Sequence, residues 1–381
     1  MKRVIILLIA ILTLFSTINV TSFASENLAL NGEAKSVILM EAATGKVLYE
    51  YQADIRLPPA SVTKIMTILL IMEEIDKGNL KLTDTVQVSE RASKMGGSQV
   101  YLKAGEIMSV EDLLKSIVVS SANDASVALA ERVSGSVEAF VSRMNERARE
   151  LGMLSTNFEN PTGLDDSVTD HLISARDIAI MSRELIRHKD IFKYTTIWTD
   201  TIRDGAFGLS NTNRLIRFYE GANGLKTGST SKAGFCISAT AERNGMQLIA
   251  VVMGSPTRDS RNETAKALLD YGFANYRSYH SDPKEASPIK VLGGIKDYCP
   301  LITESFDFVL TKDIYSKGIT VQESIPENVK APIKAGDKIG EAVIMAGDQV
   351  IGTVFIRAAE SINRLSFSEI LKRLIGSFFY S

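Results

Sequence analysis

The stretch Leu57-Pro-Pro-Ala-Ser-Val-Thr-Lys64 leads into a run of apolar residues and decides how the chain is interpreted. Its two prolines favour an extended approach, because a residue that precedes proline avoids helical backbone angles. The apolar residues from Ile65 to Met72 predict a buried helix behind this entry. Residues three apart on a helix share one face, so Ser61 and Lys64 would lie one turn apart. This pair suits a serine nucleophile with lysine as its base.

The S-x-x-K pattern is weak by itself, since it also occurs at Ser229, Ser281 and Ser287. A serine that caps a helix before a solvated lysine explains most such matches. Two further motifs, Ser121-Ala-Asn123 and Lys226-Thr-Gly228, follow in an order and with gaps typical of penicillin-binding serine acyl transferases. Together the three motifs favour catalysis over capping.

A lysine acts as a base only when its pKa is lowered, and both burial and a nearby cation have that effect. Lys226 is the candidate second cation for Lys64. We expect Ser121 to relay a proton to the leaving amine. We expect the Asn123 amide to hold a substrate carbonyl and to steady Lys64.

The segment around Lys226 is the candidate binding strand. Gly228 would let a substrate backbone lie close to the strand edge. Lys226 and Thr230 could bind a terminal carboxylate, which is the charge that a cationic site at this position would recognise.

Residues 25–276 are predicted to form an α/β domain with strands at both ends and helices in the middle. The segments 36–40 and 46–49 flank a glycine turn and predict one hairpin, and 235–240 and 248–253 predict another around Asn244-Gly245. Ser109 and Ser174 begin helices with a capping pattern. We expect the first and last strands to pair in one sheet.

The rest of the chain divides into three shorter parts. Residues 1–24 resemble a signal peptide, with a basic start and an apolar run too short for a comfortable span; an uncleaved anchor is the alternative. Residues 283–358 predict a small β-rich domain, either a sandwich or a meander. Residues 362–381 contain an amphipathic helix, whose apolar face is expected to lie on a membrane, although packing on the β domain is the alternative.

Composition excludes several classes of function. The 381 residues carry a net charge of −2, so nucleic acid is an unexpected partner. The histidines and cysteines lack metal-ligand spacing and no phosphate-binding loop is present, so we expect no metal and no cofactor. We expect Cys236 and Cys299 to be separate thiols.

Longer motifs make the resemblance specific. The chain resembles the serine D-alanyl-D-alanine carboxypeptidases, the low-molecular-mass penicillin-binding proteins, over about residues 30–275. The matching motifs are Pro58-Pro-Ala-Ser-Val-Thr-Lys-Ile-Met-Thr67, Met95-Gly-Gly-Ser98, Val119-Ser-Ser-Ala-Asn-Asp-Ala125, Asn160-Pro-Thr-Gly-Leu164, Gly224-Leu-Lys-Thr-Gly228 and Leu268-Leu-Asp-Tyr-Gly-Phe273. The β-rich part and the tail also resemble the family's second domain and membrane anchor.

The resemblance implies a role for each matching residue. Ser61 is acylated with Lys64 as its base, and the N–H groups of Ser61 and Ser229 form the oxyanion hole. Ser121 and Asn123 complete the proton relay. The remaining residues, Lys226, Thr227, Gly228, Thr230 and Arg261, hold the terminal carboxylate and backbone of the substrate.

The implied substrate is the D-Ala-D-Ala end of a peptidoglycan stem pentapeptide, and β-lactams would acylate the same serine. The implied location is the outer face of the cytoplasmic membrane. Two alternatives stay open. A class A β-lactamase would need a deacylating glutamate, for which Glu159 is the nearby candidate. A penicillin-binding wall protein without turnover is the other.

Overall fold

A computed structural model describes residues 33–166 and 168–379. The expected signal peptide, residues 1–24, lies outside the described residues. A five-stranded antiparallel sheet organises the chain up to Asn275, in the order β2-β1-β9-β8-β7. Its strands are β1 (Ser36–Glu41), β2 (Val47–Tyr51), β7 (Ala222–Thr230), β8 (Gly234–Arg243) and β9 (Met246–Ser255).

The predicted pairing of the first and last strands is confirmed. Ser36 of β1 lies opposite Met253 of β9, and the register continues to Glu41 opposite Leu248. Both predicted hairpins are present, because β1 pairs with β2 and β8 pairs with β9. β7 contributes the K-T-G motif and forms one edge of the sheet.

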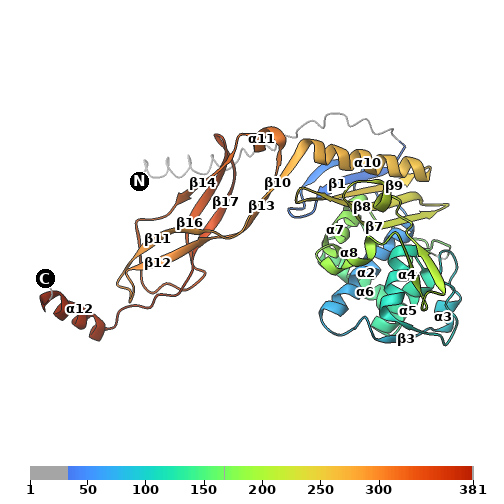
Figure 1. Ribbon diagram of the computed structural model, residues 1–381, viewed down its shortest axis with the longest axis horizontal. Helices are drawn as coiled ribbons and strands as arrows, with labels where there is room; N and C mark the ends of the chain where they lie inside the picture. The colour runs from blue at the N-terminus through green and yellow to red at the C-terminus, as the bar shows by residue number, and fades with distance from the viewer. Residues whose placement is uncertain (1–32, 167, 380–381) are drawn as a thin grey trace, which may run out of the picture. The chain divides into compact units, whose positions relative to one another are not determined.

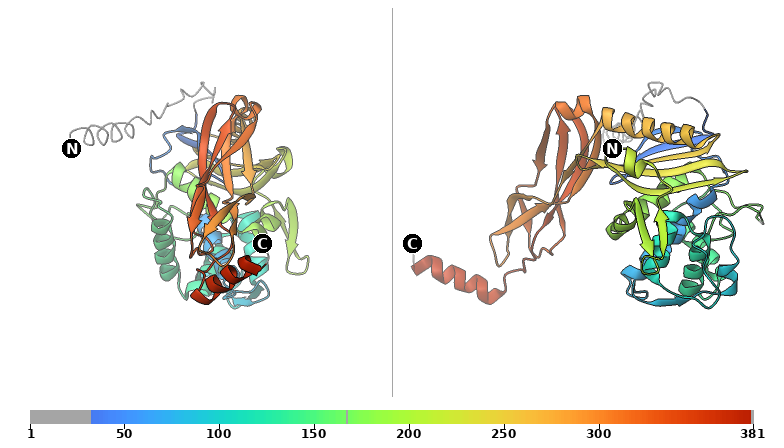
Figure 2. Two further views of the ribbon diagram at one scale, coloured as in Figure 1. Left: turned by 90° about the vertical axis from the view of Figure 1, so that its left-hand side faces the viewer. Right: turned by 45° about the vertical axis from the view of Figure 1, so that its right-hand side comes forward.

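Helices cover both faces of this sheet (Figures 1 and 2). α10 (Arg258–Asn275) packs on one face, and α7 (Ala175–Leu185) contacts the sheet from the other side. The helical layer beyond α7 is formed by α2 (Lys64–Asp76), α4 (Val110–Ser120), α5 (Asn123–Ser134) and α6 (Val137–Glu150). Short elements complete this part: α3 (Glu90–Ser93), α8 (Phe192–Thr195), α9 (Leu215–Phe218), η2 (Lys189–Ile191), β3 (Thr85–Gln87), β4 (Ile107–Ser109), β5 (Thr199–Ile202) and β6 (Phe207–Ser210).

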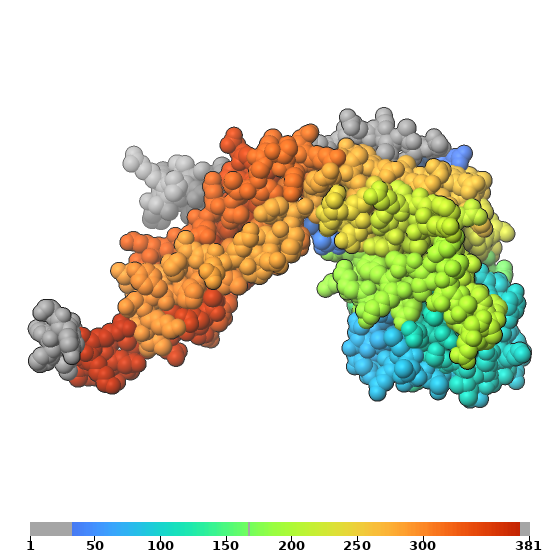
Figure 3. Space-filling model, in the orientation of Figure 1, coloured from blue at the N-terminus to red at the C-terminus, as the bar shows by residue number. Residues whose placement is uncertain are grey.

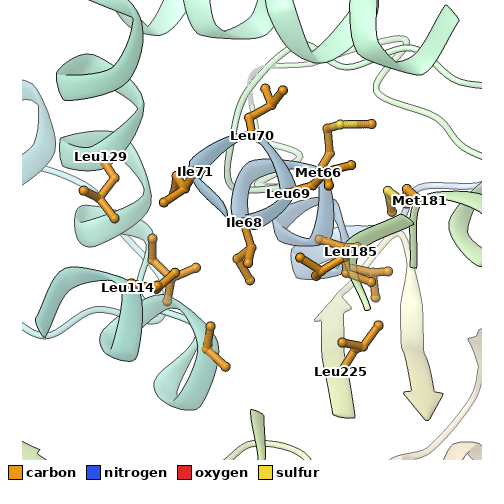
Figure 4. Close-up of a cluster of buried hydrophobic side chains, with 14 of the residues drawn as sticks. Met66, Ile68, Leu69, Leu70, Ile71, Leu114, Leu129, Met181, Leu185 and Leu225 are labelled. Carbon is orange, nitrogen blue, oxygen red and sulfur yellow. The ribbon is translucent and has the colours of Figure 1, made fainter. Parts of the chain in front are cut away.

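The α2 helix is the centre of the hydrophobic core. Its residues from Ile65 to Met72 are all buried, which explains why the apolar run is continuous rather than periodic. Figure 4 shows α2 surrounded by Leu114, Leu129, Met181 and Leu225 from neighbouring elements. A helix fixed on all sides holds its first residue, Lys64, in a rigid setting.

The start of this helix differs from the prediction. Ser61 lies in a short 3-10 turn, η1 (Ala60–Thr63), and the α-helix proper begins at Lys64. The capping serines are as expected, since Ser109 Oγ accepts a hydrogen bond from the Asp112 N–H at 3.1 Å and Ser174 Oγ from the Asp177 N–H at 3.1 Å.

The remaining chain is β-rich, as predicted, and has its own small apolar core. A six-stranded sheet has the order β14-β16-β17-β12-β11-β15, and β10 pairs with β13. β11 and β15 run parallel, so the arrangement is not a simple meander. The elements are β10 (Tyr276–Ser281), β11 (Glu285–Leu292), β12 (Tyr298–Thr303), β13 (Phe306–Thr311), α11 (Lys312–Ser316), β14 (Ile319–Ser324), β15 (Asn328–Lys330), β16 (Lys338–Ala346) and β17 (Gln349–Ala358).

The predicted terminal helix is present as α12 (Phe367–Phe379). The side chains of Phe367, Ile370 and Leu371 are exposed, and α12 is red in Figure 3. The other predicted apolar positions, Leu374, Ile375 and Phe378, lie outside the described side chains. Among residues 33–166 and 168–379, no helix combines the length and apolarity needed to span a membrane.

Candidate active site

Ser61 and Lys64 are in contact at the start of α2. The Lys64 Nζ atom lies 2.8 Å from Ser61 Oγ, 2.6 Å from Asn123 Oδ1 and 2.9 Å from the Thr162 carbonyl oxygen. The amide and carbonyl oxygens can only accept hydrogen bonds, whereas a hydroxyl can also donate. A neutral Lys64 amine therefore gives its two protons to Asn123 and Thr162 and leaves its lone pair for the Ser61 hydroxyl.

The electrostatic setting of Lys64 favours this neutral form. Complete burial holds the pKa of Lys64 well below its usual range, and the charge of Lys226 lowers it further. Asp124 opposes the shift, but its carboxylate accepts hydrogen bonds from the backbone N–H groups of Val100 and Leu102.

Asn123 begins α5 and uses both ends of its amide. Its Oδ1 atom accepts from Lys64, and its Nδ2 atom donates to the Gly96 carbonyl at 2.7 Å. The Gly96 contact joins the Met95-Gly-Gly-Ser98 motif to the site. We expected this amide to hold a substrate carbonyl, yet the structure already commits one of its N–H groups to Gly96.

Ser121 ends α4 in a left-handed conformation, with φ of 62°. Its side chain is buried, and its Oγ atom has no hydrogen-bond partner among the described residues. Ser121 and Ser61 line the same cleft. The hydroxyl is thus available to a substrate.

Lys226 is buried in β7, one residue before Thr227, which lines the cleft. Its Nζ atom donates to the Thr227 carbonyl at 2.9 Å. Burial and then the charge of Arg261 lower the pKa of Lys226 to about 7. The Thr227 hydroxyl, which lines the cleft, bonds to the Thr212 hydroxyl at 2.8 Å.

Gly228 lies in close contact with the segment that carries Ser61. A Cβ atom at this position would lie 2.8 Å from the Ser61 nitrogen and 2.9 Å from the Pro59 oxygen. Glycine at this position therefore permits a close approach between β7 and the segment that carries Ser61, and the predicted approach of a substrate backbone stays a prediction. This contact holds Ser61 beside the K-T-G strand.

Thr230 ends β7, one residue beyond Ser229, and its predicted role in binding a carboxylate stays a prediction. Its hydroxyl donates to the Asp165 carboxylate and accepts from the Ala233 N–H at 3.0 Å. It stabilises the turn after β7. Ser229 lines the cleft with Ser61.

Arg261 lies near the start of α10 and lines the cleft together with Ser61. It is only 3% exposed, and its guanidinium donates to the Asn262 side-chain oxygen at 2.8 Å and to the Cys236 carbonyl at 3.4 Å. Burial lowers its pKa to about 10. A buried guanidinium that bonds only neutral oxygens suits an incoming carboxylate.

The cleft has a volume of about 660 Å³ and carries no carboxylate. Its lining residues are Ser61, Ser98, Ser121, Trp198, Asn211, Thr212, Arg214, Phe218, Thr227, Gly228, Ser229, Arg258 and Arg261. Among the described residues, no three His, Cys, Asp or Glu side chains gather in a way that could hold a metal ion. Cys236 and Cys299 are separate buried thiols, as expected.

Thr162 is a site residue that sequence reasoning missed. It belongs to the Asn160-Pro-Thr-Gly loop, in which Asn160 Oδ1 accepts from the backbone N–H groups of Thr162 and Gly163. This turn aims the Thr162 carbonyl at Lys64. The motif was visible in the sequence, but a backbone oxygen leaves no side-chain signal.

Glu159, the candidate deacylating glutamate of a β-lactamase, is bound within its own loop. Its carboxylate accepts from the backbone N–H groups of Thr169 at 3.0 Å and Asp170 at 3.3 Å. It is not among the residues that line the cleft. Its role is to hold its own loop together.

Comparison with known proteins agrees with this geometry. Residues 22–257 match the D-alanyl-D-alanine carboxypeptidase family, and residues 275–364 match the penicillin-binding protein 5, C-terminal domain family. The chain belongs to the D-alanyl-D-alanine carboxypeptidase family. It is 43% identical over 350 residues to D-alanyl-D-alanine carboxypeptidase DacF from Bacillus subtilis, covering 90% of each chain.

Solved structures extend the comparison to both parts of the fold. Penicillin-binding protein 5 from Haemophilus influenzae matches with a TM-score of 0.77 and 32% identity, covering 87% of this chain and 98% of that one. Penicillin-binding protein D2 from Listeria monocytogenes, in its ampicillin-bound form, matches with a TM-score of 0.58 and 32% identity, covering 63% and 98%.

Proposed function

We propose that this carboxypeptidase removes the terminal D-alanine from peptidoglycan stem pentapeptides through an acyl-enzyme on Ser61. The observation that carries the proposal is the 2.8 Å contact between Ser61 Oγ and the fully buried Lys64 amine. Burial keeps this amine neutral, so it can accept the serine proton.

Each residue of the site has one task in the proposed reaction. Lys64 takes the Ser61 proton as the Oγ–C bond forms, and the N–H groups of Ser61 and Ser229 receive the oxyanion. The C–N bond to D-alanine then breaks, and Ser121 passes a proton to the leaving amine. Water cleaves the ester, which releases the shortened peptide and restores Ser61.

The cationic end of the cleft fixes the direction of the substrate. Lys226 and Arg261 attract the terminal carboxylate, and the Thr227 hydroxyl can donate to it. Support for Thr227 comes from its position in the cleft lining, and Thr230, whose hydroxyl bonds Asp165, is the further candidate. The exposed edge of β7 supplies backbone hydrogen bonds to an extended peptide.

Penicillin would acylate Ser61 in the same way and persist, because the described cleft offers no carboxylate to activate water. The alternative, a β-lactamase, depends on Glu159, whose carboxylate is bound to the loop at Thr169. Rapid multiple turnover of penicillin that required Glu159 would favour that alternative.

The activity test is direct. Purified protein is given a pentapeptide muropeptide, and the products are weighed by mass spectrometry; loss of one D-alanine is expected. Fluorescent penicillin should label Ser61, and Ser61→Ala should abolish both results. Ser287→Ala, which removes another S-x-x-K serine, is the matched control. Labelling that survives in Ser61→Ala contradicts the assignment.

The proposed location follows from the ends of the chain. Residues 1–24 would direct export, 25–276 would form the catalytic domain and 283–358 the β-rich domain, with 362–381 holding the enzyme at the outer face of the cytoplasmic membrane. Support comes from the exposed Phe367, Ile370 and Leu371 on α12. Such a face would gain free energy on entering a membrane interface.

A further inference from the structure

The cleft contains more positive charge than one terminal carboxylate can neutralise. Arg214 and Arg258 line it together with Arg261. No Asp or Glu is among the lining residues. A D-alanine leaving group carries a single carboxylate, so at least one guanidinium is left without an anion.

Arg258 is the clearest example of a guanidinium group in the cleft without an anion. It occupies the first position of α10, three residues before Arg261, so the two side chains leave the helix on one face. Neither Arg258 nor Arg214 forms an ion pair or a side-chain hydrogen bond with any described residue, although exposed arginines elsewhere in this chain, such as Arg56 and Arg91, pair with carboxylates. Both guanidinium groups also act on Arg261, whose pKa they lower, which places them near the carboxylate site.

With Arg261 bound to the terminal carboxylate, as in the proposed function, the three guanidinium groups that line the cleft would lie on the leaving-group side of the scissile bond. The terminal carboxylate, which Arg261 would bind, belongs to the residue that departs. A second anion that reaches Arg258 must therefore belong to that same departing residue. The cleft volume of about 660 Å³ leaves room for a side chain larger than the methyl group of D-alanine.

We propose that Arg258, with Arg214 beside it, forms a second anion subsite that favours substrates whose leaving amino acid carries an additional carboxylate. The substrate class is acyl-D-alanyl amides of acidic D-amino acids. Peptides cross-linked through a residue with a further carboxylate belong to this class. The inference rests on the proposed function, because that function places the terminal carboxylate of the substrate at Arg261.

The test compares two isosteric leaving groups, D-glutamate and D-glutamine, in the peptides diacetyl-L-lysyl-D-alanyl-D-Glu and diacetyl-L-lysyl-D-alanyl-D-Gln. We expect wild-type kcat/KM to be about two- to fivefold higher for the D-Glu peptide, as for a partly exposed ion pair. The preference should shrink as salt rises. Arg258→Gln should bring the ratio close to one. Arg149→Gln, which removes an exposed charge from the end of α6, should keep the wild-type ratio.

Binding of both peptides to the Ser61→Ala protein, measured by calorimetry, separates this inference from the proposed function. Failure of the proposed function would appear as no turnover of D-Ala-D-Ala peptides by the wild type, while the ratio of the two Kd values would still report on Arg258. Equal Kd and kcat/KM values for the two peptides in the wild type would overturn the second subsite. A ratio that Arg258→Gln leaves unchanged would overturn it as well.

Discussion

The Lys64 amine and the Asn123 side-chain oxygen are 2.6 Å apart in the buried centre of the site. The same Asn123 amide donates to the Gly96 carbonyl, which fixes which end of the amide faces Lys64. The orientation matters because an oxygen at this position accepts a hydrogen bond from the Lys64 amine, so that the lone pair of the Lys64 nitrogen stays free for the Ser61 hydroxyl. Three sequence-distant segments thereby determine the direction of one proton transfer.

The Lys226 charge should produce a bell-shaped pH dependence of kcat/KM. Activity rises as Lys64 loses its proton, and it falls again above pH about 7, where Lys226 loses the charge that binds the carboxylate. Lys226→Gln should move the rising limb to higher pH, because the cation that lowers the pKa of Lys64 is gone. It should also raise KM.

Penicillin acylation rates and peptide kcat/KM between pH 5 and 10 are the measurement for this prediction. Lys232→Gln removes a lysine beyond the end of β7 and is the control. If Lys226→Gln left both the pH profile and KM untouched, Lys226 would have no part in the site.

Gly228→Ala should disable acylation without unfolding the protein. The new Cβ atom would lie within 3 Å of three backbone atoms of the η1 turn, so Ser61 must shift. A displacement of this size in a nucleophile costs on the order of a hundredfold in rate. Gly208→Ala is the control, because a Cβ atom there meets nothing within 4 Å. Wild-type acylation rates in Gly228→Ala would refute the close-packing explanation.

His171 should make the stability of the protein depend on pH. Its Nδ1 atom accepts from the Glu159 N–H at 2.9 Å, and its Nε2 atom lies 2.8 Å from the Thr63 hydroxyl. Burial lowers the pKa of His171 from 6.5 to about 4. Between these values the unfolded chain binds more protons than the folded one, so the free energy of unfolding falls as pH drops.

The loss from this histidine should approach about 3 kcal/mol between pH 6.5 and 4. Denaturant unfolding of wild type and His171→Gln across that range measures it, and the variant should show a weaker pH dependence. His280→Gln removes an exposed histidine and should not flatten the curve in this way. Parallel curves for His171→Gln and wild type would exclude this contribution.

The sequence predicted the elements better than it predicted the hydrogen bonds. The continuous apolar run after Ser61 and the turns of the two hairpins are local sequence signals, and the structure contains the elements that they predict. The hydroxyl of Thr230 bonds the Asp165 carboxylate and the Ala233 N–H, and the motif that contains Thr230 encodes neither contact.

Other features of the site could not be predicted from residue types. The Thr162 carbonyl reaches Lys64 only because Asn160 closes a turn around it. Gly228 faces the η1 turn because β7 lies beside a segment that precedes it by more than 160 residues. Such contacts depend on tertiary packing, which spacing within a motif does not encode.

The last prediction concerns the terminal helix α12, and the structure shows where the chain can be truncated to remove it. A truncation after Ala359 would remove Ile362, which is fully buried in the β-rich core and pairs with Ile333. A truncation after Leu365 avoids this damage, because it keeps Ile362 and removes α12. The shortened mature protein should hydrolyse small peptides at the wild-type rate, since no residue of α12 lines the cleft.

The same truncated protein should fail to co-sediment with vesicles that contain anionic lipid. The exposed Phe367, Ile370 and Leu371 would each contribute about 1.5 kcal/mol or more on burial. Lys372 adds attraction to anionic headgroups, whereas Arg373 is paired with Asp297. Ile370→Glu in the full-length mature protein is a second variant that keeps the helix but breaks its apolar face. Vesicle binding by both variants at the wild-type level would show that α12 is not the anchor.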